Sequence, residues 1–230
     1  MDKAEFYRDA RTDLPGPLAG VKVLEVTTSW AGPMAGCVLA DLGADVVKCE
    51  IPSGEMSRHM PVKVPGTSLA FLNQAVNRNK RSLSLDLHLD EGRDVFLRLV
   101  ASSDIVVENF LPGTLARWGV GYEQCRAVKP DIVYVSISGW GQFGPESHRA
   151  GYDPIAQAAS GWMSINGSAA AVVPKDANRS TQAAHCARGR VTISVAALIR
   201  AGSRPRLARA VRRQPAGPKL GRRQRRPRSP

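Results

Sequence analysis

A strand, a helix and a second strand follow one another near the start of the chain. Residues 21–26 (VKVLEV) and 45–49 (DVVKC) are short apolar runs rich in β-branched side chains, and residues 34–42 (MAGCVLADL) read as a helix that ends at Gly43. A βαβ unit of this kind joins two parallel strands by a right-handed crossover. The first 50 residues therefore predict a parallel sheet.

The same alternation continues to residue 160. We expect strands at residues 82–87, 105–108 and 132–138, and helices at 91–101 with Asp90 as N-cap, 112–118, 122–128 and 154–160. This pattern is typical of an α/β fold with a Rossmann-like parallel sheet flanked by helices. Ligands in such sheets bind beyond the carboxyl ends of the strands, which predicts binding loops at residues 27–33, 108–113 and 139–153.

The composition changes near residues 168–170. Residues 170–230 contain 16 Lys and Arg but one acid, Asp176, whereas the rest of the chain contains 16 Lys and Arg and 19 Asp and Glu, so the net charge of +12 originates in the tail. We divide the chain into an N-terminal extension (1–16), an α/β domain (17–168) and a tail (169–230). The tail is rich in Arg, Ala, Pro and Gly, and apart from residues 191–199, which fit a short strand or a helix, we expect it to be disordered.

Several motifs of cofactor binding and catalysis are absent from the sequence. The loop after the first strand has Gly32 and Gly36 but no G-x-G-x-x-G, and neither a phosphate-binding G-x-x-x-x-G-K-[ST] nor a G-x-S-x-G nucleophile elbow occurs. The four histidines and four cysteines lack metal-ligand spacing, so we expect no metal and reduced thiols. Residues 1–13 lack the apolar core of a signal peptide, and no apolar run reaches 18 residues. We therefore expect a cytoplasmic protein without a membrane span.

Four segments in order carry a more specific signal. They are residues 17–50 (PLAGVKVLEVTTSWAGPMAGCVLADLGADVVKCE), 77–87 (NRNKRSLSLDL), 107–121 (VENFLPGTLARWGVG) and 136–160 (SISGWGQFGPESHRAGYDPIAQAAS). Together they closely resemble the family III CoA-transferases, a family that includes the α-methylacyl-CoA racemases. The resemblance implies a Rossmann-like large domain, a smaller domain and an interlocked homodimer. It also implies CoA transfer from an acyl-CoA thioester to a carboxylic acid through an aspartyl mixed anhydride, without a cofactor or metal.

The resemblance also assigns residues to the CoA site. In chain order these are Trp30 and Ala31 in the first loop, against CoA, Leu85, Asp86, Leu87 and His88 at the adenine end, Asn109, Phe110 and Leu111 at the pantetheine or diphosphate, Arg117 at a phosphate, and Ala150, Gly151, Tyr152 and Asp153 near the reacting end. Simpler interpretations stay open for some of them. These are core packing for Trp30, a cap of the turn before Pro112 for Asn109, and the N-cap of the following helix for Asp153. Likewise, Arg78, Lys80 and Arg81 belong either to a solvated loop or to a phosphate contact.

The sequence departs from the family pattern at three places. Ile51 follows Glu50 where many members have an arginine that meets a CoA phosphate, and Arg58 is a possible substitute. Tyr152 stands where the racemases carry a histidine, and a tyrosine with an ordinary pKa of about 10 suits proton transfer at an α carbon poorly, which favours a transferase. Residues 169–230 contain no match to the turn that carries the nucleophilic aspartate. We therefore leave the catalytic residue unassigned.

These departures lead to one expectation and two alternatives. We expect the N-terminal part of a CoA-transferase, with the small domain and a complete active site missing, and a reading-frame shift near residues 167–170 would account for the tail. One alternative is an α-methylacyl-CoA racemase. The other is a non-enzymatic protein whose basic tail binds nucleic acid, although the tail lacks the interleaved aromatic side chains that stack on bases.

Overall fold

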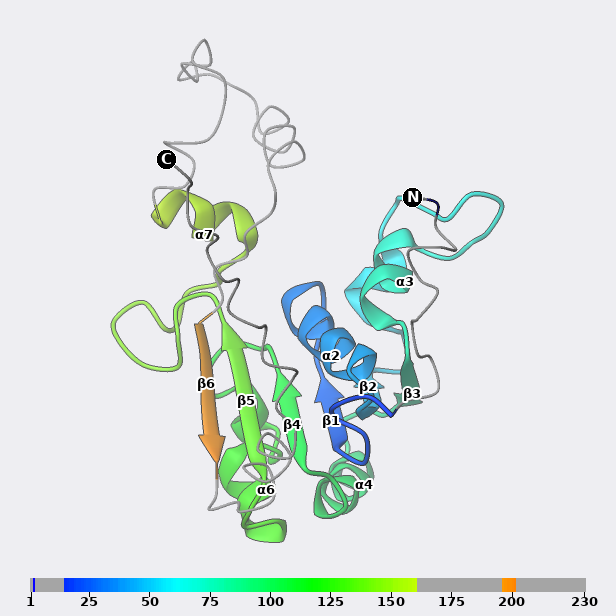
Figure 1. The fold of residues 1–230 in the computed structure, drawn as a ribbon. Helices are drawn as coiled ribbons and strands as arrows, with labels where there is room; N and C mark the ends of the chain where they lie inside the picture. The colour runs from blue at the N-terminus through cyan, green and yellow to red at the C-terminus, as the bar shows by residue number, and fades with distance from the viewer. Residues whose placement is uncertain (1, 3–14, 161–195, 202–230) are drawn as a thin grey trace, which may run out of the picture.

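A computed structural model describes residues 2, 15–160 and 196–201 of the chain (Figure 1). Its centre is a six-stranded sheet in the order β3-β2-β1-β4-β5-β6. The strands are β1 (Lys22–Val26), β2 (Asp45–Glu50), β3 (Lys80–Ser84), β4 (Ile105–Glu108), β5 (Val133–Ser138) and β6 (Ala196–Ala201). Strands β1 to β5 are mutually parallel, and β6 pairs antiparallel with β5. The predicted Rossmann-like parallel sheet is confirmed.

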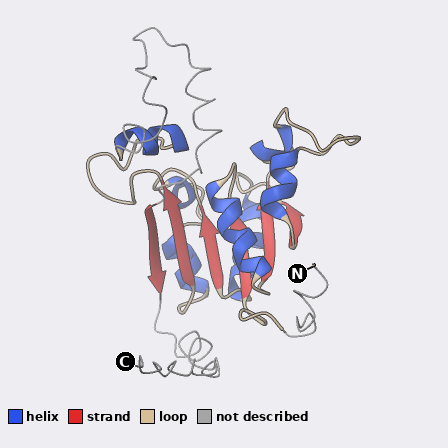
Figure 2. Cartoon of the chain, turned by 45° about the horizontal axis from the view of Figure 1, so that its top comes forward, coloured by secondary structure: helices blue, strands red, loops and turns tan. Residues whose placement is uncertain are grey.

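Helices cover both faces of this sheet (Figure 2). The helical elements of the described residues are α2 (Ala31–Asp41), the 3₁₀ turn η1 (Met56–His59), α3 (Phe71–Asn77), α4 (Asp90–Ala101), α5 (Thr114–Arg117), α6 (Tyr122–Val128) and α7 (Asp153–Ala159). Of these, α7 lies beyond the carboxyl end of β5 rather than over a face (Figure 1). On one face, Ala40 of α2 packs with strand residues such as Val23 and Val46. On the other face, Phe96 of α4 and Cys125 of α6 pack with a second set of strand residues. The apolar side chains of β1, β2, β4 and β5 alternate between these two cores, as the pleat requires.

Several element ends differ from the predicted ones. Helix α2 begins at Ala31, three residues earlier than predicted. Pro33 does not prevent this start, because the N–H that a proline lacks would have no partner in the first helical turn. Strand β3 spans Lys80–Ser84 rather than residues 82–87. Its partner β2 ends at Glu50, which is opposite Ser84, so the chain has no ladder to continue along.

The predicted helix starts at residues 90 and 112 are also corrected. Asp90 is the first residue of α4 and Leu89 is the N-cap, and the Asp90 carboxylate pairs with Arg93 one turn later. Helix α5 begins at Thr114, two residues after Pro112, because Gly113 takes a left-handed conformation (φ 81°) between them. Helix α6 has the predicted bounds.

Strand β6 is the one described element within the predicted tail. Residues 196–201 pair with the whole of β5, in the register Val133↔Ala201 to Ser138↔Ala196. The segment overlaps residues 191–199, for which a short strand was one of two predicted structures. The remaining tail residues and residues 3–14 lie outside the described part of the chain, so the proposed extension and tail stay predictions.

Candidate functional site

An apolar pocket of about 240 Å³ lies at the carboxyl ends of β1 and β2. We refer to it as the edge pocket. Its walls come from the loop that follows β1, the segment that follows β2, and the side chains of Leu85, Leu87, His88, Phe110 and Trp118. From β1 the sheet extends through β2 to β3 on one side and through β4 to β5 on the other, so the strand order reverses between β1 and β4. The edge pocket lies at the carboxyl ends of the strands beside this reversal. Open α/β sheets bind their ligands at such a point.

Aromatic rings form one wall of the edge pocket. The Trp118 ring meets the His88 ring edge to face with centroids 4.6 Å apart, and it meets the Phe110 ring in the same way at 5.2 Å. Such edge-to-face pairs hold their partners in fixed relative orientations. Trp118 was not among the predicted site residues. Its place one residue after Arg117, in the segment already assigned to CoA, was the available signal.

Four of the predicted residues therefore come together in one pocket, namely Leu85, Leu87, His88 and Phe110. Asp86 lies between two of them, and its carboxylate accepts hydrogen bonds from the His88 amide and from His88 Nδ1, each at 2.9 Å. These bonds from His88 lower the pKa of Asp86, so the carboxylate stays ionised. The pair holds the imidazole at the rim of the pocket.

The other predicted residues lie outside the pocket lining. Leu111 and Arg117 are exposed, and Arg117 donates to Thr114 Oγ1 at 3.0 Å. Trp30 is the N-cap of α2 and is 42% exposed, which rules out plain core packing, whereas Ala31 packs against the core beneath α2. Ala150, Gly151 and Tyr152 are exposed on the loop that follows β5.

Asp153 is the first residue of α7, and Tyr152 takes the N-cap position, so the N-cap interpretation of Asp153 is wrong by one residue. The Asp153 carboxylate instead accepts a hydrogen bond from Gln157 Nε2 at 2.5 Å, one turn along the helix. An acidic side chain in the first turn also interacts favourably with the positive end of the helix dipole. This contact gives Asp153 a structural place at the start of α7.

Asn109 connects two loops at the carboxyl edge. Its Oδ1 accepts from the Thr28 amide and its Nδ2 donates to the Thr28 carbonyl, each at 2.8 Å. A side-chain amide that pairs with both the N–H and the C=O of one residue imitates a β-sheet pairing and fixes the two peptide groups that flank that residue. The interpretation of Asn109 as a cap for the turn before Pro112 is therefore replaced by a bridge to the first loop.

Glu108 ends β4 directly beneath Phe110. Its side chain is buried, and it accepts a hydrogen bond from the Phe110 amide at 2.8 Å and another from Ser136. Burial raises the pKa of Glu108 despite these two bonds. The carboxyl group thereby holds the backbone that presents the Phe110 ring to the pocket.

A buried group of charges lies behind the first loop. Glu25 on β1 pairs with Lys48 on β2 (3.1 Å) and with Lys80 on β3 (2.7 Å), and all three side chains are at most 3% exposed. The lysines also donate to backbone carbonyls, Lys48 to that of Thr27 in the first loop at 3.1 Å and Lys80 to that of Pro33 in α2 at 2.7 Å. The sequence signal for this group was a charged residue within each of the apolar strands β1 and β2, Glu25 and Lys48, which we did not interpret.

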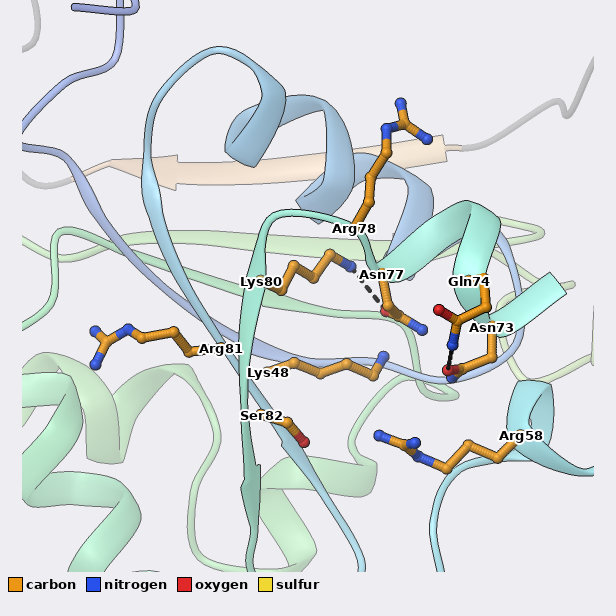
Figure 3. A pocket seen from close by; sticks show the side chains of 9 residues that line it. All are labelled: Lys48, Arg58, Asn73, Gln74, Asn77, Arg78, Lys80, Arg81 and Ser82. Atoms are coloured by element: carbon orange, nitrogen blue, oxygen red, sulfur yellow. Dashed lines mark hydrogen bonds between the residues drawn. The ribbon is translucent and has the colours of Figure 1, made fainter. Parts of the chain in front are cut away.

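A second pocket, of about 220 Å³, is lined by Lys48, Arg58, Asn73, Gln74, Asn77, Arg78, Lys80, Arg81 and Ser82 (Figure 3). Every cation in its wall already has a carboxylate partner: Glu25 for both lysines, Glu50 for Arg58, Asp41 for Arg78 and Asp45 for Arg81. Its positive charge is therefore largely balanced, which argues against a phosphate site there. Arg78 and Arg81 are exposed, as a solvated loop predicts, whereas Lys80 is buried.

Arg58 is engaged in the same way. Its Nε donates to Glu50 Oε2 at 2.7 Å and its Nη2 pairs with the other carboxylate oxygen. Burial opposes ionisation of Glu50, but the hydrogen bonds from Arg58, from the Glu55 amide and from Ser82 outweigh it and lower the pKa of Glu50 to about 2. Arg58 therefore neutralises Glu50, and its predicted use as a substitute phosphate contact would compete with this pair.

Within the described residues, His, Cys, Asp and Glu side chains form no group of three that would hold a metal ion. No helix in the same part of the chain has both the length and the apolar character needed to cross a membrane.

The fold and the edge pocket define an α/β protein with an apolar pocket at the carboxyl edge of a parallel sheet. The sequence model of CoA-transferase family III matches residues 18–201, and the chain belongs to this family. The match includes residues 169–201 of the predicted tail.

Curated relatives and a solved structure agree with this assignment. The chain is 46% identical over 153 residues to the succinyl-CoA:glutarate CoA-transferase of Mus musculus, a match that covers 66% of this chain and 35% of the relative. It is 47% identical over 159 residues to the succinyl-CoA:mesaconate CoA-transferase of Haloarcula hispanica, which covers 66% of this chain and 40% of the relative. The structure of a CAIB/BAIF family protein from Brucella suis superimposes with a TM-score of 0.63 at 43% identity, over 67% of this chain and 42% of that chain. The matched part thus spans about two fifths or less of these relatives.

Proposed function

We propose that this chain provides the CoA-binding part of a CoA-transferase, with the edge pocket as the site for the CoA moiety. The observation that carries the proposal is the convergence of Leu85, Leu87, His88 and Phe110, which the family resemblance assigns to CoA, on one apolar pocket. Ligand pockets of this kind are mostly apolar with a few polar groups that fix orientation, and here His88 and Asp86 supply such groups at the rim.

The reaction that we propose is acyl transfer through a mixed anhydride. An aspartate carboxylate attacks the thioester carbonyl, the C–S bond breaks, and CoA leaves as the thiolate. The acceptor carboxylate then attacks the aspartyl carbonyl of the anhydride, and the donor acid leaves as its carboxylate. CoA thiolate attacks the acceptor's carbonyl in the resulting anhydride, which forms the new thioester and releases the aspartate carboxylate. Each step forms one acyl bond and breaks one, so no oxidant, reductant or metal is consumed. The nucleophile is not assigned to any residue of this chain.

The names of the relatives suggest the substrates to test first. Both curated relatives above are named for succinyl-CoA as donor and for a dicarboxylic acid as acceptor. We propose a succinyl-CoA-dependent transfer to a dicarboxylate, by a cytoplasmic homodimer as the family resemblance implies. Isotope exchange from labelled glutarate or mesaconate into the CoA thioester tests the transfer, and sedimentation velocity tests the dimer. A racemase would instead exchange the α proton of a 2-methylacyl-CoA with solvent.

Binding of CoA is the direct test of the edge pocket. We expect calorimetry to detect CoA binding by the full chain, and we expect Phe110→Ala to weaken it at least tenfold because the ring is part of the pocket wall. Phe71→Ala is the matched control, since Phe71 is 58% exposed at the start of α3 and does not line the edge pocket. Equal loss in both variants, or undiminished binding in Phe110→Ala, would remove the support for the edge pocket. Retention on heparin that persists after CoA saturation would favour a nucleic-acid-binding role.

A further inference from the structure

The Glu55 side chain is a buried hub between the first loop and η1. It is the N-cap of η1, it is 5% exposed, and its Oε2 accepts from the amides of Ser29 (3.0 Å) and Ser57 (2.9 Å). The Thr28 hydroxyl lies 3.3 Å from the same oxygen. The other oxygen, Oε1, accepts from the Ser57 hydroxyl and, at 3.5 Å, from Asn73 Nδ2. Both oxygens of the carboxylate are thus used inside the protein.

The charge of Glu55 is retained despite its burial. Burial by itself favours the neutral acid, but the two hydrogen bonds from Ser57, the Lys48 ammonium at 4.0 Å and the Ser29 amide outweigh it and lower the pKa of Glu55. Hydrogen bonds to an ionised acceptor are stronger than those between neutral groups. A carboxylate at this position therefore holds the Ser29 amide more firmly than a neutral acceptor would.

Ser29 needs such a hold because of its backbone conformation. Its φ is 69°, in the left-handed region, which disfavours a residue with a Cβ and persists when the surroundings over-determine it. On one side, the N–H and the C=O of Thr28 are both hydrogen-bonded by the Asn109 side chain. On the other side, Trp30 accepts the first hydrogen bond of α2, from the Met34 amide at 2.8 Å. The conformation of Ser29 thus sets how the first loop enters α2.

We propose that Glu55 is a positioning residue for CoA binding: its carboxylate holds Thr28 and Ser29 so that this wall of the edge pocket exists before CoA arrives. Thr27, Thr28 and Glu55 all line the pocket, so a change in this loop changes the pocket itself. A wall ordered in advance does not have to be ordered by the ligand, which improves affinity. This inference rests on the proposed function, because it takes CoA as the ligand of the edge pocket.

The variant Glu55→Gln tests the proposal. Glutamine has nearly the same shape, but it replaces one acceptor oxygen by an NH₂ group that points at hydrogen-bond donors. We expect amide hydrogen exchange in residues 27–31 of the ligand-free chain to accelerate at least tenfold, with exchange in β4 and β5 unchanged. We also expect the CoA dissociation constant to rise at least tenfold. Asp45→Asn is the control, since Asp45 is an exposed carboxylate paired with Arg81 at the start of β2, the strand end opposite the edge pocket, and neither readout should move.

A second substitution separates positioning from general stability. Glycine adopts the left-handed conformation without penalty, so Ser29→Gly should restore part of the CoA affinity in the Glu55→Gln background. A residue that acts only through global stability would give no such rescue. Should Glu55→Gln fail to fold, Glu55→Asp can be measured in the same two ways. Aspartate keeps the negative charge, but its carboxylate is one methylene further from the Ser29 amide.

Unchanged exchange in residues 27–31 of Glu55→Gln would overturn the positioning role. Faster exchange with unchanged CoA affinity would overturn it as well. If the unmodified chain does not bind CoA at all, the proposed function fails, and the exchange measurement still decides whether Glu55 orders the first loop.

Discussion

The buried lysine Lys80 and its neighbour Arg81 provide a direct test of what the charges inside this fold contribute. Both residues lie on the edge strand β3, and each pairs with one carboxylate of the sheet. The Lys80–Glu25 pair is 2.7 Å long with side chains 2% and 0% exposed, whereas the Arg81–Asp45 pair, also 2.7 Å, has side chains 68% and 44% exposed. Distance and secondary structure are thus matched, and burial differs.

The structure gives the magnitudes to expect from Lys80→Met and Arg81→Met. Removing Lys80 leaves the buried Glu25 carboxylate with one cation, Lys48, instead of two, and the loss of one partner of a buried pair costs about 3–5 kcal/mol. Because Lys48 remains, we expect the lower end, about 3 kcal/mol. Removing Arg81 breaks an exposed pair, which is worth about 0–1 kcal/mol. Burial also lowers the pKa of Lys80, so desolvation is the cost that the contact with Glu25 offsets.

Urea denaturation followed by circular dichroism measures the difference. With a slope of about 1–3 kcal/mol per molar urea, the midpoint of Lys80→Met should fall by about 1–3 M, and that of Arg81→Met by less than half of this. A Lys80→Met variant that is as stable as the parent chain would refute the reasoning, since it would show that methionine packing compensates fully for the cation that Glu25 has lost. Equal losses in both variants would show that burial is not the deciding variable.

Three further outcomes follow from the described contacts. The pKa of Glu50 is lowered from 4.5 to about 2, so its pair with Arg58 stabilises the fold above pH 4.5, and this contribution is lost as the pH falls toward 2. Glu50→Gln should therefore flatten the acid side of a curve of unfolding free energy against pH. An unchanged acid side would contradict this. Burial raises the pKa of both Cys49 and Cys125 to about 12, so neither thiol should react with a disulfide reagent at pH 8 until urea unfolds the chain, which absorbance titration of the released thiolate will show. Gly36→Ala should lower the unfolding midpoint by an amount comparable to a buried-pair loss, because a Cβ on Gly36 would overlap the buried Glu25 carboxylate of β1 beneath α2; a thermal melt equal to that of the parent would argue against it.

The elements that the sequence predicted well are those whose signal is local. Apolar runs with β-branched side chains marked β1, β2, β4 and β5, and helix α6 was predicted with its observed bounds. A parallel arrangement followed from the alternation of strands and helices, and the carboxyl edge then followed as the place for a ligand. These inferences need only the periodicity of side chains along the chain.

The contacts that build the site are not local, and the sequence did not reveal them. Asn109 binds a peptide 81 residues earlier in the chain, and the lysines on β2 and β3 meet a carboxylate on β1. Strand β3 ends at Ser84 because its partner β2 ends opposite it at Glu50. Strand β6 forms because the backbone groups on the outer side of β5 are available to pair with it. Residue types and spacing determined this protein's fold class, its family and the edge of the sheet that carries the pocket. Tertiary structure alone decided which side chains meet at that edge, because the packing of strands distant in sequence sets those distances and the burial of their charges.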